Sequence, residues 1–221
     1  MPGTSLRTDG TDRLRTRAKI TNALLIAFLI ASALSIMGTI YAVTMGTSGG
    51  AGSMMLVGIG LIGLAWFALF VIAGIAFLVW LYRARANLQE AGQPDLKYSA
   101  GWSVASFFVP LVNFVVPMRT MRELHNRSEG EDPDLSDASV PSVASWWACH
   151  IAGVIVVVFN TLVLSVDAIP GVYVLTPPII TLGVSILGTL LLVGSAWFLR
   201  RAVLDITDAQ DSFLNIENTF A

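Results

Sequence analysis

Four long apolar stretches alternate with polar segments along the chain, at about residues 20–44, 54–81, 143–166 and 179–199. The hydrocarbon core of a bilayer is about 30 Å thick, so a helix needs about 20 apolar residues to cross it. Each stretch meets that length. The pattern predicts an all-α integral membrane protein, with a membrane domain over 20–203 that holds four transmembrane helices in a bundle.

The second stretch is expected to continue as a helix beyond its apolar part. Arg83, Arg85 and Glu90 follow at helical spacing, and Gly92 and Pro94 are stop signals. This helix therefore extends into an aqueous compartment.

Both ends of the chain are polar. Residues 1–19 carry five cations and are expected to be disordered. Residues 204–221 place apolar side chains on one helical stripe and acids elsewhere, which predicts an acidic amphipathic tail in the cytoplasm. Because an acidic helix is a poor binder of anionic membranes, we expect the tail to dock on protein, either its own basic layer or a partner. The stripe comprises Ile206, Ala209, Phe213, Ile216 and Phe220.

Composition supports the membrane assignment. The chain is 55% hydrophobic and 13% charged, whereas soluble domains carry about 25% charged residues. A soluble protein of this size has no core large enough to bury so many apolar side chains.

The positions of the cations predict the topology. All 13 Lys and Arg residues precede the first span, lie between the second and third, or follow the fourth. The loops at 46–53 and 167–178 contain none. Since cations concentrate in cytoplasmic segments, both termini are predicted to be cytoplasmic.

A fifth apolar segment, 101–118, is uncharged but contains Pro110, Asn113 and Pro117. Prolines break the backbone ladder, and irregular backbone survives at membrane depth only when protein or a wet cavity surrounds it. We therefore predict a re-entrant or interfacial hairpin on the cytoplasmic side. A kinked fifth span is the alternative.

Small side chains predict where helices pack, because close approach drives association in lipid. One stripe in the first span is expected to face another helix, and three glycines in the second span are expected to give one close-approach turn. These residues are Ala23, Ala27, Ala31, Ser35 and Thr39, and Gly58, Gly60 and Gly63. Tryptophans near span ends are predicted to anchor at the headgroup level. They are Trp80, Trp146, Trp147 and Trp197.

The segment from Trp80 to Trp147 resembles a bacterial membrane family known as domain of unknown function 4328 (DUF4328). The most distinctive string is Phe-Val-Pro with Asn113 and Pro117 after it. The other matching positions are Arg83, Arg85, Asn87, Gly101, Trp102, Met121, Arg122, Glu123, Leu124 and Trp146. The resemblance implies the span layout and the bacterial inner (plasma) membrane, and it implies no activity.

The spans hold few reactive groups. Cys149 and His150 lie in the third span, and a lone histidine there is expected to make a helix contact. Asn160 is expected to form an interhelical hydrogen bond. A single cysteine excludes an internal disulfide. We expect no cofactor, no metal site and no enzymatic activity, since no acid/base pair is evident.

The candidate site is the cytoplasmic layer, where basic and polar groups are expected to bind anionic lipid headgroups. The alternative is that Glu123 only pairs with Arg119 and Arg127, four residues away on a helix. The candidate residues are Arg83, Arg85, Asn87, Trp102, Pro110, Asn113, Pro117, Arg119 and Glu123.

These features favour a non-catalytic scaffold, or a lipid-binding or partner-binding protein, that acts at its cytoplasmic face. A small channel or transporter for a neutral solute, using the 101–118 hairpin, is the alternative. A membrane-protein partner or a homo-oligomer fits the first reading. Nucleic-acid binding is not expected, because the cations are few and their positions are explained by the membrane topology.

Overall fold

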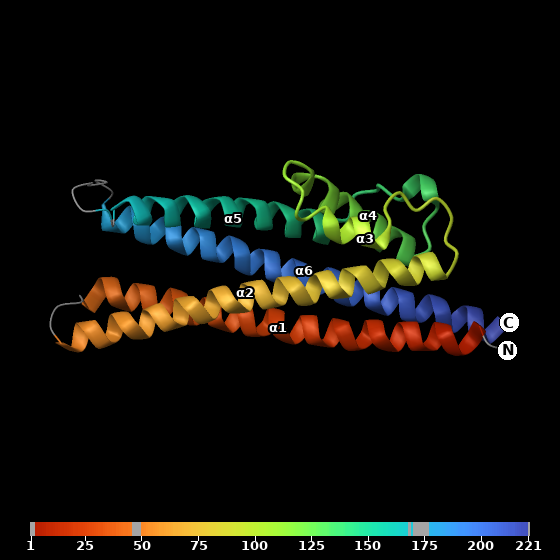
Figure 1. Cartoon of the computed structure of the whole chain (residues 1–221), viewed down its shortest axis with the longest axis horizontal. Coiled ribbons are helices and arrows are strands. Elements are labelled where there is room, and N and C mark those ends of the chain that lie inside the picture. The colour runs from red at the N-terminus through yellow and green to blue at the C-terminus, as the bar shows by residue number, and fades with distance from the viewer. Residues whose placement is uncertain (1–2, 46–49, 168, 170–176, 221) are drawn as a thin grey trace. The chain divides into compact units, whose positions relative to one another are not determined.

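The computed structural model describes residues 3–45, 50–167, 169 and 177–220, and this part of the chain contains helices and no strand. Four helices are each long and apolar enough to cross a membrane, as the sequence predicted (Figure 1). They are α1 (Gly3–Met45), α2 (Gly50–Glu90), α5 (Pro141–Asp167) and α6 (Pro178–Phe220). The shorter elements are α3 (Ala100–Ala105), η1 (Val112–Phe114), α4 (Val116–Ser128) and η2 (Pro133–Leu135). Of the predicted loops at 46–53 and 167–178, residues 46–49, 168 and 170–176 lie outside the described residues, and 50–53 belong to α2.

The chain forms two compact units. The charged unit comprises Met1–Leu25, Ile72–Ser145 and Phe198–Ala221, and the apolar unit comprises Ile26–Val71 and Trp146–Trp197. Every Lys and Arg of the sequence falls in the charged unit, and Asp167 is the single acid of the sequence in the apolar unit. The boundary between the two compact units therefore also separates all of the Lys and Arg residues from the apolar unit.

Close packing and hydrogen bonds between side chains hold the apolar unit together, and two of these bonds link neighbouring helices. Trp66 Nε1 donates to Ser32 Oγ over 2.8 Å, which ties α2 to α1. Asn160 Nδ2 donates to Ser185 Oγ over 3.0 Å, so the predicted interhelical bond of Asn160 joins α5 to α6. His150 stacks on Trp147 with ring centroids 5.4 Å apart. His150 also stacks on Phe70 of α2, with ring centroids 6.3 Å apart, and this is the predicted contact with another helix.

The small-residue stripe of α1 is only partly buried. Ala23 is exposed, whereas Ala27, Ala31, Ser35 and Thr39 are half-buried. Nothing outside α2 lies within 4 Å of a Cβ built on Gly58, Gly60 or Gly63. Size alone did not identify the most buried face of α1, because large apolar, small and polar side chains share it at heptad-like spacing. Those buried residues are Leu14, Ala18, Thr21, Leu25, Phe28 and Ser32.

The close approach is between α5 and α6. A Cβ on Gly153 would lie 2.8 Å from Leu192 Cδ2, and one on Gly188 would lie 2.9 Å from Val157 Cγ2. Each glycine therefore accommodates a side chain of the facing helix.

In the charged unit, the described residues 3–19 are helical, whereas the sequence suggested disorder for this segment. The reason is packing, since Leu14 and Ala18 are buried. Gly10 allows close contact with α2, because a Cβ there would lie 2.5 Å from Arg83 Nη2. The polar composition hid this apolar stripe.

The end of α2 agrees with the prediction. The helix continues to Glu90, and Gly92 follows with a φ of 71°. Gln93 N donates to Leu88 O and Gly92 N to Gln89 O, which is a Schellman ending. Glycine is favoured there because side chains disfavour this left-handed conformation.

The C-terminal part of α6 belongs to the charged unit. Ile206 is completely buried while Asp205 and Asp208 are exposed, in keeping with the predicted stripe. Arg15 on α1 forms an ion pair with Asp211. The side chains of Phe213, Ile216 and Phe220 lie outside the described residues.

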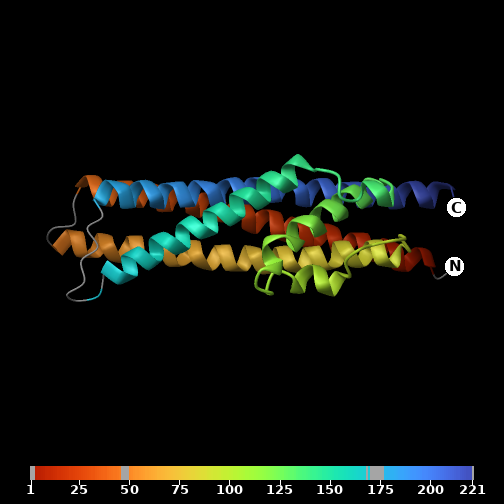
Figure 2. The ribbon, with the colours of Figure 1, turned by 90° about the horizontal axis from the view of Figure 1, so that it is seen from above.

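The segment 101–118 forms a helical hairpin that stacks on α2 within the charged unit (Figures 1 and 2). Its first arm, α3, has six residues and is about 9 Å long. The described helices in this segment are each too short to cross a membrane, and the segment is not among the four candidate spans. Leu111, with a φ of 66°, interrupts the helical backbone after Pro110.

Three of the four tryptophans are buried in protein, which corrects their predicted role as headgroup anchors. Trp80 is completely buried, and its Nε1 donates to Thr207 Oγ1 over 3.1 Å. Trp146 and Trp147 are also buried. Trp197 is 43% exposed and remains a candidate anchor. A buried indole N–H needs a partner, and Thr207 was not evident from the local sequence.

Candidate functional site

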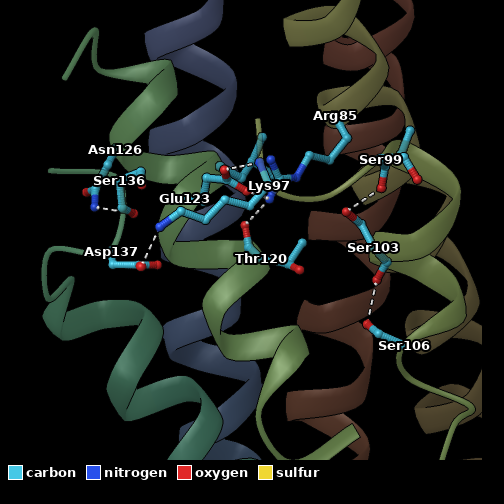
Figure 3. A network of polar contacts seen from close by, with 12 residues as sticks. Arg85, Lys97, Ser99, Ser103, Ser106, Thr120, Glu123, Asn126, Ser136 and Asp137 are labelled. Atoms are coloured by element: carbon cyan, nitrogen blue, oxygen red, sulfur yellow. Dashed lines mark hydrogen bonds and ion pairs between the residues drawn. The ribbon is translucent and has the colours of Figure 1, made fainter. Parts of the chain in front are cut away.

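A fully buried ion pair lies at the centre of the charged unit. Arg85 Nη2 on α2 donates to Glu123 Oε2 on α4 over 2.6 Å, and neither side chain is exposed (Figure 3). The same Nη2 donates to Thr120 O over 2.9 Å. Glu123 Oε1 accepts a bond from the Lys97 backbone N over 2.7 Å. One carboxylate therefore joins α2, α4 and the segment before α3.

This arrangement differs from the predicted pairing of Glu123 with Arg119 and Arg127. Arg127 is buried and donates instead to two backbone carbonyls, those of Glu131 and Pro94. Arg119 is exposed on another side of α4. The helical spacing suggested a local pair, but the partner of Glu123 comes from α2, which no local pattern reveals.

Arg83 and Asn87 also serve the packing of the charged unit. Arg83 forms a two-bond ion pair with Glu90, at 2.9 and 2.8 Å. Asn87 Nδ2 donates to Gln210 Oε1 over 3.2 Å, and Gln210 Nε2 donates onward to Ala84 O and Ser128 Oγ. The bonds of Gln210 tie α2, α4 and α6 together, whereas the pair of Arg83 and Glu90 lies within α2.

A cavity of about 20 Å³ lies beside this cluster. That volume has room for about one water molecule. Its lining residues are Asn87, Leu88, Ala91, Gln93, Arg127, Ser128 and Gln210.

Other candidates face outward on the hairpin and on α4. Arg119 is exposed and forms no hydrogen bond or ion pair through its side chain with any residue that the structure describes. Arg122, one turn further along α4, is half-buried, and its Nε has no hydrogen-bond partner. Asn113 Oδ1 is buried and lacks a partner too. Trp102 and Pro110 are exposed, while Pro117 is buried in the first turn of α4.

The family model for the domain of unknown function DUF4328 matches residues 53–208, well over half of the chain. The chain belongs to the DUF4328 family. No curated protein and no solved structure matches it. The match includes both partners of the buried ion pair, Arg85 and Glu123, and it ends before Gln210.

In this DUF4328 protein, the sequence identified Arg85 and Glu123 as important but missed what joins them. Lys97 and Thr120 contribute through backbone atoms, which side-chain patterns do not report. Gln210 lies four residues after buried Ile206, on the same face of the helix. A polar residue on that apolar stripe was the one sequence feature that could have indicated a buried hydrogen-bonding role for Gln210.

A second structural residue that the sequence did not reveal is Asn126. Its Nδ2 donates to the carbonyl oxygens of Leu135, Ser136 and Ala138, each over 3.1 Å. These bonds tie residues 129–138, the acidic linker that leads from α4 toward α5, to α4. The linker is thus an ordered part of the charged unit.

The exposed ion pair of Lys97 and Asp137 lies near this cluster, with Nζ to Oδ2 at 2.6 Å (Figure 3). The hydrogen bond to Asp137 raises the pKa of Lys97. Because both side chains are about half exposed, solvent screens the pair and its contribution to stability is small.

Proposed function

We propose that this protein is a non-catalytic, multi-pass protein of the bacterial inner membrane that binds anionic lipid headgroups at its cytoplasmic face. Both termini and the whole charged unit are cytoplasmic in this proposal. The concentration of every cation in that unit supports the orientation, since membrane proteins retain Lys and Arg on the cytoplasmic side.

One observation carries the lipid-binding proposal. On α4, Thr120 and Glu123 point inward to Arg85, whereas Arg119 and Arg122 form no ion pair with a described acid. No acid occurs between residues 98 and 122. A cation near an anionic membrane surface contributes about 1 kcal/mol, so the two together favour anionic lipid by more than tenfold.

The buried cluster has a supporting role in this proposal. The ion pair Arg85–Glu123 and the bonds of Gln210 fix α4 against α2 and α6. A fixed α4 presents Arg119 and Arg122 as a constant surface, which suits a platform for lipids or for a partner protein.

The test is the lipid retained by the purified full-length protein, extracted and quantified by mass spectrometry. We expect phosphatidylglycerol and cardiolipin to be enriched over phosphatidylethanolamine, relative to the source membrane. The double variant Arg119→Gln/Arg122→Gln should lose most of this enrichment. Lys97→Gln removes one cation that already has an acidic partner and should keep it. Equal enrichment in the double variant and in the native chain would contradict the proposal.

A further inference from the structure

The loop of the hairpin exposes large apolar side chains. Phe108 is 72% exposed and Leu111 is 80% exposed, and Phe114 and Val115 follow at 49% and 42%. We call these four residues the apolar tip. No charged residue occurs from Tyr98 to Met118. In a chain with four helices apolar enough to cross a membrane, such a surface needs an apolar environment.

The apolar tip lies beside the apolar part of α2. Phe107, which precedes the tip, packs its ring edge-on against Phe77, with centroids 5.8 Å apart and planes at 75°. Phe77 comes six residues before Arg83, the first cation of α2, which is about 9 Å along the helix axis. Side chains that insert into the boundary between headgroups and acyl chains reach about 5–10 Å. The apolar tip, about 9 Å from Arg83 along the axis of α2, lies within that range of depths.

The outward-facing cations agree with this level. Glu123 on α4 lies opposite Arg85 on α2. Arg119 is one turn nearer the tip, about 6 Å along α4. Arg119 therefore lies between the tip and the buried ion pair, where headgroups are expected if the tip contacts acyl chains.

The backbone of Leu111 adds a second observation. Its φ of 66° and ψ of −42° are rarely adopted by a residue with a side chain. Such strain persists where function requires it or where the surroundings compensate for it. The protein does not compensate by burying this side chain, because Leu111 has the highest exposure of the tip. Acyl chains around Leu111 would bury this side chain.

We infer that the apolar tip inserts into the acyl-chain region of the cytoplasmic leaflet, with Arg119 and Arg122 at the headgroups above it. This inference rests on the cytoplasmic orientation in the proposed function and identifies the bilayer as the source of the bound lipid. Lipid is the occupant, and not a second copy of the chain, because two tips that met would also bring their unpaired arginines together. Anionic headgroups attract those arginines.

The experiment measures the depth of a spin label in the full-length protein. The lone cysteine is first replaced by Cys149→Ser, and Leu111→Cys is then labelled with a nitroxide. The protein is placed in bilayers of phosphatidylethanolamine and phosphatidylglycerol. Collisions with oxygen, which concentrates among acyl chains, are compared with collisions with a water-soluble nickel chelate.

Two labelled controls bracket the measurement. Leu135→Cys lies in the acidic linker and is 50% exposed, while Leu61→Cys lies in the apolar part of α2 and is 62% exposed. We expect the oxygen-to-nickel collision ratio at Leu111 to resemble that at Leu61 and to exceed that at Leu135 several-fold. A ratio like that of Leu135 would overturn the inference. Low collision rates with both reagents would also overturn it, because they would mean that another protein surface covers the tip.

Failure of this inference and failure of the proposed function give different results. A label at Leu111 that contacts water, together with normal enrichment of anionic lipid, rejects insertion alone. If the label at Leu111 lies among acyl chains but the native protein shows no enrichment of anionic lipid, headgroup binding alone is rejected. Leu111→Asn gives a second measurement, because Asn tolerates positive φ and removes the apolar side chain. We expect the Leu111→Asn variant to retain its helical content and to show fewer oxygen collisions at a label on the adjacent Phe108→Cys.

Discussion

Arg85 and Glu123 are separated by 2.6 Å and by 37 intervening residues of sequence, and both side chains are completely buried. The chain therefore places two opposite charges where water does not reach them. Only the pair is stable there, since an isolated buried charge is far more costly than two that neutralise each other.

Removing one partner is expected to be strongly destabilising. Arg85→Met leaves the Glu123 carboxylate without its cation and should cost about 3–5 kcal/mol of unfolding free energy. The double variant Arg85→Met/Glu123→Leu should recover most of that loss. Unfolding in mixed detergent micelles, followed by circular dichroism, measures both.

The exposed pair of Lys97 and Asp137 provides a matched control at the same 2.6 Å separation. Asp137→Asn should change stability little, because solvent already screens this pair. A similar loss for Asp137→Asn and Arg85→Met would show that burial does not determine the effect.

Gly153 is predicted to be intolerant of a side chain. Gly153→Ala places a Cβ within 2.9 Å of two atoms of Leu192 and should destabilise the α5–α6 contact by about 1–3 kcal/mol. Gly60→Ala in α2 meets nothing within 4 Å and should be neutral or stabilising. Thermal denaturation in one detergent compares the two. The opposite order would mean that the glycine face of α2 is the tighter contact in the membrane.

Asn126 is expected to control the protease sensitivity of the acidic linker. Asn126→Asp removes the donor and places a carboxylate against three carbonyl oxygens, so residues 129–138 should detach from α4. Limited proteolysis with an acid-specific protease should then cut this linker at least several-fold faster. If the Asn126→Asp variant resists cleavage as native protein does, other contacts hold the linker.

The proposed topology predicts which cysteines a membrane-impermeant maleimide reaches in whole cells. In a Cys149→Ser background, Met54→Cys at the start of α2 should react from outside the inner membrane, after permeabilisation of any outer membrane. Leu135→Cys should react only after lysis. Both native side chains are exposed, at 81% and 50%, so access to the reagent depends on the compartment. Labelling in the reverse order would invert the topology.

The sequence predicted the elements that depend on composition and local signals. The four apolar helices and the end of α2 at Gly92 follow from length, hydropathy and glycine conformation. The contact faces did not follow, because Ala23 and Gly60 are small without facing a neighbour, while Gly153 is small and does.

For the candidate site, the sequence identified the residues and assigned the wrong partners. Arg83, Arg85 and Asn87 were expected to face a ligand; Arg85 and Asn87 bond to α4 and α6, while Arg83 pairs with Glu90 on its own helix. The partners of Arg85 and Asn87, Glu123 and Gln210, are distant in sequence. Arg119 is exposed and has no partner among the described residues, so it can still contact a ligand as predicted.

The grouping of every cation within the charged unit has a consequence for how the chain is made. On the proposed topology, three separate basic segments each direct the insertion machinery toward the same orientation, and no translocated loop opposes them. Loss of any one arginine during evolution leaves at least one cation in each segment, so all three segments still favour the same orientation. Insertion in the proposed orientation therefore tolerates the loss of a single cation. Individual basic positions are then open to selection for other roles, such as contact with lipid.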